Sequence, residues 1–136
     1  ETEGEIAFFQ HQANFGKSSA IRQSASDREI SVPVRPVGTI LHAAGFSEDA
    51  VGLVWMDIEG YEPVACRSMQ ALMARRVPLY MEFSPTFYGL EGTIAFVAEL
   101  ARHYEDCIIF REDEQIAMKV EDIPVDEEQF DLFLFP

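Results

Sequence analysis

Two apolar runs separated by a helical pattern constrain the fold of this chain more than any other feature. Residues 51–56 are almost continuously apolar, which is typical of a strand buried on both faces of a sheet, and Trp55 is expected in the core. A helical pattern over residues 61–76 follows, and a second apolar run covers residues 78–83. Strand, helix and strand with short links predict a βαβ unit with parallel neighbouring strands. The chain is therefore expected to be an α/β protein.

The remaining patterns predict one hairpin before this unit and a group of elements after it. Residues 1–37 are expected to form a β-hairpin with strands at 4–9 and 30–37 and a long polar loop between them. Residues 51–136 are expected to hold the βαβ core and the closing strands of a single partial domain. The other expected elements are helices at 39–44 and 90–104, strands at 107–110, 116–120 and 130–135, and a helical turn at 126–129.

Charge and composition exclude several classes of partner. The chain has 24 acidic and 10 basic residues and a net charge of -14, which argues against nucleic acid or an anionic membrane as the main partner. No apolar run is long enough to span a bilayer, and the opening residues do not resemble a secretory signal. Cys66 and Cys107 are too few for a disulfide framework and are expected as buried thiols in a cytoplasmic protein. The start at Glu1, without Met, indicates a chain cut from something longer.

Three acidic residues are expected to meet at one edge of the sheet. Asp57 and Glu59 follow the first parallel strand, and Glu82 lies near the end of its neighbour, about 5 Å away laterally. Such a group suits a divalent metal, a general base or acceptors for substrate hydroxyls and amines. Alternatively, Asp57 or Glu59 caps the following helix. His42 is a further candidate base, although a lone histidine is more often without a catalytic role.

The block from Asp57 to Glu62 carries a resemblance to a known family. The sequence Val-Trp-Met-Asp-Ile-Glu-Gly-Tyr-Glu, followed by a helix and a strand ending at Glu82, resembles the FkbM family of S-adenosylmethionine-dependent methyltransferases. The strand and serine-rich loop near the N-terminus and the closing strand 130–135 are similar to that family too. Gly38 or a neighbour stands where the family usually has an acidic residue.

The resemblance implies a Rossmann-like class I fold and methylation of a hydroxyl on a sugar or another small-molecule natural product. The family's glycine-rich cofactor turn is missing, so the chain is expected to be the C-terminal half of the catalytic domain, inactive alone. S-adenosylmethionine would be bound mostly by the missing half. In this interpretation Asp57 and Glu59 orient the acceptor or bind a metal with Glu82, and His42 is a further candidate base. The remaining expected substrate-binding residues lie in the polar loop and are Asn14, Ser18 and Ser19.

Two other functions compete with a methyltransferase. The chain could be a non-catalytic acidic α/β fragment or interaction module, which the missing cofactor motif favours. It could also be a hydrolase that uses the carboxylate group to hold a divalent metal. Strand edges and an apolar face left uncovered by the missing half predict self-association.

Overall fold

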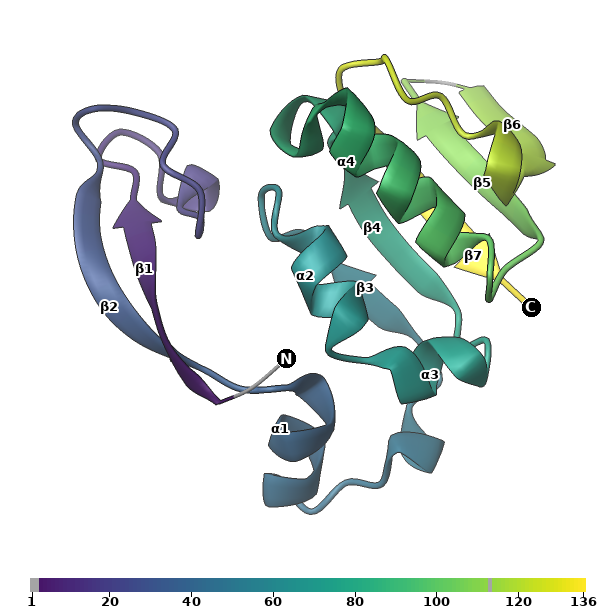
Figure 1. Ribbon diagram of the computed structural model, residues 1–136, viewed down its shortest axis with the longest axis horizontal. Helices are drawn as coiled ribbons and strands as arrows, with labels where there is room; N and C mark the ends of the chain where they lie inside the picture. Colours follow the sequence, from purple (N-terminus) through teal and green to yellow (C-terminus); the bar gives the residue numbers. More distant parts are fainter. Residues whose placement is uncertain (1–2, 113) are drawn as a thin grey trace.

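The computed structural model describes residues 3–112 and 114–136, which form two β-sheets and four α-helices (Figure 1). The strands are β1 Gly4–Gln10, β2 Arg28–Val34, β3 Val54–Met56, β4 Leu79–Phe83, β5 Asp106–Arg111, β6 Glu114–Lys119 and β7 Phe130–Phe135. The helices are α1 Val37–Ala43, α2 Glu62–Arg67, α3 Gln70–Ala74 and α4 Pro85–Leu100, with short 3-10 turns η1 Phe15–Lys17, η2 Glu48–Ala50 and η3 Val120–Asp122. The chain is thus an α/β protein, as its sequence predicts.

The larger sheet has five strands in the order β3-β4-β7-β5-β6. Strands β3 and β4 are parallel, which confirms the predicted βαβ pairing. Strand β7 is antiparallel to both β4 and β5, so β3, β4 and β5 all run in one direction. Their carboxyl ends therefore lie at the same edge of the sheet, together with the start of β7.

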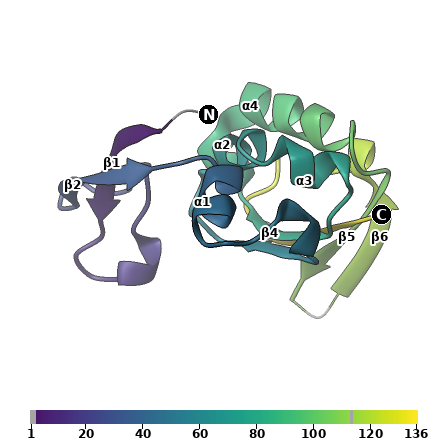
Figure 2. The same cartoon turned by 90° about the horizontal axis from the view of Figure 1, so that it is seen from below.

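Within the described part of the chain, helices cover only one face of this sheet. Figure 2 shows α2, α3 and α4 on one side of the strands, where the core lies. Apolar residues on that side are almost completely buried, because alternate residues of each strand point toward the helices. They include Leu79, Met81 and Phe83 of β4, Leu132 and Leu134 of β7, and Cys107 and Ile109 of β5. Both cysteines are buried and free, as predicted.

The prediction that residues 51–56 form a strand buried on both faces is wrong. Only Val54–Met56 form a strand, and Trp55 is 76% exposed rather than part of the core. Leu53 is also more than half exposed. The apolar run is consistent with two apolar faces, but Trp55 points away from the core, and among the described residues α2, α3 and α4 all lie on the core side of the sheet (Figure 2).

Two predicted helices differ from the observed ones. The helix expected over residues 61–76 is broken into α2 and α3 at Met69. The turn at this break places Met69, Leu72 and Met73 in the core. The hydroxyl of Ser68 donates to the Ala65 carbonyl, a local bond that favours a break in the helix. The second helix begins at Pro85 rather than at residue 90, and Gly89 interrupts its helical geometry with φ of 67°. Residues 125–128 form bends, and the helical turn expected at 126–129 is not formed.

The hairpin of β1 and β2 extends away from the larger sheet (Figure 1). Its strands pair antiparallel from Gly4 opposite Val34 to Gln10 opposite Arg28, which confirms the prediction. The loop at its tip is ordered by its own hydrogen bonds: Asp27 accepts from the backbone of Gln23 and Ser24. Among the described residues, no helix has the length and apolar character needed to cross a membrane.

Candidate functional site

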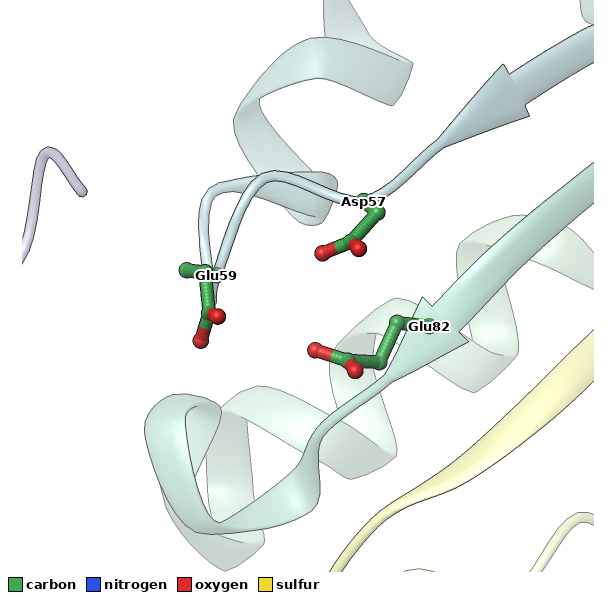
Figure 3. Close-up of side chains that lie close together, drawn as sticks. All are labelled: Asp57, Glu59 and Glu82. Carbon is green, nitrogen blue, oxygen red and sulfur yellow. The ribbon is translucent and has the colours of Figure 1, made fainter. Parts of the chain in front are cut away.

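The structure brings three carboxylates together at the carboxyl edge of β3 and β4. Asp57 and Glu59 come from the loop after β3, and Glu82 lies near the end of β4 (Figure 3). One carboxylate oxygen of each residue lies within 4.8 Å of those of the other two. Asp57 is exposed, whereas Glu59 and Glu82 are partly buried. We refer to Asp57, Glu59 and Glu82 as the carboxylate cluster.

A fourth carboxylate, Glu62, builds the loop that carries the cluster. Its side chain is completely buried, and its Oε1 atom accepts hydrogen bonds from the backbone N–H groups of Ile58 (3.1 Å) and Gly60 (3.3 Å). The hydroxyl of Tyr88 donates to Oε2 at 2.8 Å. Burial, and next the charge of Glu62, hold the pKa of Tyr88 well above its ordinary value, so this tyrosine remains a donor.

The alternative expectation, that Asp57 or Glu59 caps the following helix, is wrong. Neither residue caps α2, whose N-cap residue Tyr61 makes no side-chain capping bond. Glu62 instead accepts from the backbone N–H groups of Ile58 and Gly60, so the carboxylates of Asp57 and Glu59 are not used for capping. Sequence reasoning gave Glu62 no role and missed Tyr88, because 26 residues separate the two and no local pattern links them.

The turn at Gly60 requires glycine. Its φ is 95°, a conformation that residues with a Cβ rarely adopt. A Cβ atom added there would lie 2.7 Å from Cβ of Phe87 and 2.8 Å from Cδ1 of Ile21. Glu59 also has positive φ, 53°, which directs its side chain into the cluster at some conformational cost.

The loop between β1 and β2 contacts the turn that contains Glu59 and Gly60. The buried hydroxyl of Ser19 donates to the carbonyl oxygen of Glu59 at 2.7 Å. Nε2 of Gln23 lies 3.4 Å from Oε2 of the same residue. Ser19 therefore holds the Glu59 backbone in place, and the polar loop that was expected to bind substrate is attached beside the cluster.

The other residues expected at the site lie outside the cluster. Asn14 Oδ1 accepts from the Gly16 backbone and Ser18 Oγ accepts from the His11 backbone, so both support the hairpin tip. His42 belongs to α1 and lines a separate cavity with Phe46. The structure thus joins Ser19 to the turn carrying the cluster, but it does not bring Asn14, Ser18 or His42 into the cluster.

Glu82 is the cluster member with the most perturbed acidity. Loss of hydration raises its pKa from the ordinary 4.5 to about 7, and repulsion by Asp57, Glu59, Glu62 and Asp131 adds to the shift. Among the described residues, nothing forms a hydrogen bond with its buried Oε2 atom. Near neutral pH this carboxyl can therefore both donate and accept a proton, as a general acid or base requires.

An open cleft of about 950 Å³ extends from Glu82 along the same edge of the sheet. It passes the start of β7 and the end of β5, and most of its charged lining is acidic. The exception is Arg111, which pairs with Glu127 and lies over the ring of Phe130 at 5.6 Å. The lining residues include Phe110, Arg111, Glu114, Asp126, Phe130 and Asp131. The cleft provides space beside Glu82 for a small molecule.

The cluster can bind in two chemically distinct ways. Its oxygens accept hydrogen bonds from hydroxyl or ammonium groups, and their separations also allow one divalent cation to bind several of them. The chain matches no protein-family model, no curated protein and no solved structure. The functional interpretation therefore depends on the geometry of the carboxylate cluster and on the sequence motif that contains it.

Proposed function

We propose that this chain is the acceptor-binding part of an S-adenosylmethionine-dependent O-methyltransferase with a Rossmann-like fold, similar to the FkbM family. The observation that carries the proposal is the convergence of Asp57, Glu59 and Glu82 at the carboxyl edge of parallel strands. The buried Glu62 supports it, because every acidic position of the family-like block then has a defined place. The substrate would be a sugar or another small molecule that carries a hydroxyl group.

The chain's own residues would position and deprotonate this hydroxyl. Asp57 and Glu59 accept hydrogen bonds from the acceptor and fix its orientation, which is a large part of what methyl transfer requires. Glu82 accepts the hydroxyl proton as the new carbon–oxygen bond forms, which its pKa of about 7 allows near neutral pH. S-adenosylmethionine would supply the methyl group from its positively charged sulfonium.

The described residues fit the acceptor better than the cofactor. Negative charge at the cluster favours a nearby sulfonium. However, the sequence contains no G-x-G-x-x-G pattern after a strand that would hold the rest of the cofactor. We therefore assign only the acceptor side to this chain, and we expect residues 1–136 alone to be inactive.

A divalent-metal hydrolase is the second candidate, favoured by the spacing of the cluster oxygens. Three carboxylates within 4.8 Å are suitable ligands for Mg²⁺ or Mn²⁺, and a bound cation would lower the pKa of Glu82. Such an ion could activate a water molecule for hydrolysis. A noncatalytic role, in which the cluster serves a binding surface, is the remaining alternative.

Calorimetry distinguishes these functions. S-adenosylhomocysteine is titrated into the natural full-length protein and into residues 1–136, and Mg²⁺ and Mn²⁺ are titrated separately. The methyltransferase proposal predicts binding of S-adenosylhomocysteine by the full-length protein and loss of methyl transfer in Asp57→Asn and Glu59→Gln variants. Glu91→Gln is the matched control, because Glu91 is an exposed acid of α4. Metal binding without S-adenosylhomocysteine binding would instead support the hydrolase.

A further inference from the structure

The carboxylate cluster is divided between two segments of the chain, so its geometry depends on how these segments are held together. Asp57 and Glu59 belong to the loop between β3 and α2, and they face Glu82 of β4 across a gap (Figure 3). Carboxylates whose oxygens lie within 4.8 Å of one another repel, and this repulsion pushes the loop away from the strand. Another contact must therefore hold the loop at a fixed distance from β4.

The hydroxyl of Tyr88 makes this contact, because it is hydrogen-bonded toward both segments. It accepts a hydrogen bond at 3.2 Å from the backbone N–H of Ser84, the residue that directly follows β4. It donates to Oε2 of Glu62 at 2.8 Å. Oε1 of the same carboxylate accepts from the backbone N–H groups of Ile58 and Gly60 in the loop. Four hydrogen bonds therefore form one continuous path from the end of β4 to the loop.

The ring of Tyr88 is fixed by its packing, which gives its hydroxyl a defined position. The ring makes edge-on contacts with Phe83 of β4 and Phe96 of α4, with centroid distances of 5.5 and 5.6 Å. Phe83 and Phe96 are both buried, and their rings stack on each other at 5.7 Å. A ring packed against two buried aromatic rings has little space in which to move. The hydroxyl of Tyr88 is therefore held at a constant distance from β4.

The break in α4 at Gly89 gives the turn that carries Tyr88 its own direction. Residues 85–88 form the first turn of α4, and Gly89 separates this turn from the rest of the helix with φ of 67°. The hydroxyl of the buried Thr93 donates to the Gly89 carbonyl at 2.8 Å, which satisfies a carbonyl group at the break. A Cβ added at Gly89 would meet no atom within 4 Å, so the backbone conformation, and not a lack of space, favours glycine here.

We propose that Tyr88 is a positioning residue for the acceptor site, whose hydroxyl holds the loop after β3 at a fixed distance from Glu82. Tyr88 acts through Glu62 and does not itself contact the acceptor. The role of the cluster as an acceptor site rests on the proposed function. The role of Tyr88 in holding the cluster together can be tested without it.

The test compares two tyrosines in the natural full-length protein. Tyr88→Phe removes the hydroxyl and keeps the ring. Tyr104→Phe is the matched control, because Tyr104 is also buried and its hydroxyl donates to the Val77 carbonyl at 2.6 Å. Val77 precedes β4, at the end of this strand that lies away from the cluster. Both variants lose a buried hydrogen bond and should lose stability, but only Tyr88→Phe interrupts the path to the cluster.

NMR of the side-chain carboxyl carbons at neutral pH measures the effect on the cluster. The Glu82 resonance is identified in isotope-labelled protein by its absence from a Glu82→Gln variant. In Tyr88→Phe the loop can move away from Glu82, so fewer charges lie beside this carboxyl. Its resonance should therefore shift toward that of an ionised carboxylate, whereas Tyr104→Phe should leave it unchanged.

Amide hydrogen exchange, followed by mass spectrometry, measures how firmly the loop is held. Residues 57–61 should exchange about five- to tenfold faster in Tyr88→Phe, which corresponds to the loss of one hydrogen bond. The same residues should exchange at the wild-type rate in Tyr104→Phe.

Two results would overturn the proposal. An unchanged Glu82 resonance in Tyr88→Phe, with the variant folded by circular dichroism, would show that the loop keeps its place without the hydroxyl. Equal changes in Tyr104→Phe would show that both tyrosines only stabilise the fold. Calorimetry with S-adenosylhomocysteine separates this proposal from the proposed function. If the wild-type full-length protein does not bind it, the methyltransferase is contradicted, while the NMR comparison still decides the role of Tyr88.

Discussion

The two faces of the five-stranded sheet have similar chemistry but opposite surroundings. Phe83 and Leu132 point toward the helices and are completely buried, whereas Trp55 on the other face is 76% exposed. The completely buried Glu62, at the start of α2, lies on the covered side, whereas the partly buried Glu82 of β4 lies on the open side. Coverage by helices, rather than residue type, therefore decides which side chains stabilise this fold.

The largest difference between the faces should appear in phenylalanine substitutions. Phe83→Ala removes a buried ring that contacts Tyr88, Phe96 and Phe130, and should lower the free energy of unfolding by about 3–5 kcal/mol. Phe133→Ala is the matched substitution on the open face and should cost only about 1 kcal/mol. Urea denaturation followed by circular dichroism measures both. Equal losses would show that the open face is covered in solution.

Substitution of Glu62 tests the carboxylate on the covered side. Glu62→Gln places an amide NH₂ group among donors, so one of its three hydrogen bonds is lost and a donor is left unsatisfied. We expect a loss of about 1–3 kcal/mol in the free energy of unfolding. Glu91→Gln, at an exposed position, should change stability little. A similar loss of stability in both variants would show that the hydrogen bonds of Glu62 do not stabilise the fold.

A third prediction concerns the pH dependence given by Glu82, which is only partly buried, on the open side. Its pKa in the folded state is about 7, above the ordinary 4.5, so folding favours the protonated carboxyl. The stability it contributes is present at low pH and is lost as the pH rises through about 7. Glu82→Gln should therefore gain stability relative to wild type between pH 5 and pH 8. The free energy of unfolding is measured for both proteins across this pH range. A constant difference between them would contradict a pKa of about 7 for Glu82.

Much of the fold could be predicted from local sequence patterns. Alternating residues and turn signals located the hairpin, and short links identified the parallel pair β3 and β4. The break of the predicted helix at Met69 was missed, because burial of Met69, Leu72 and Met73 outweighed the helical propensity of the segment. The insertion of β7 between β4 and β5 also has no local signal.

The candidate site was predictable only in part. Strand direction alone placed Asp57, Glu59 and Glu82 at one edge, and the structure has them together. The contacts that hold their loop involve distant residues: Tyr88 reaches Glu62, and Ser19 reaches the Glu59 carbonyl. No spacing rule connects such residues, because the contacts exist only after the hairpin and α4 have folded against the loop.

The sequence by itself indicated the strands to within a few residues, the apolar character of both faces of the central strands, and the acids that follow them. The tertiary structure decided which face is covered, and with it that Trp55 is exposed while Glu62 is buried. The reason is physical. The pattern of apolar residues indicates how much of its surface a strand can bury. Whether a given side chain is buried depends on which other elements pack against the strand.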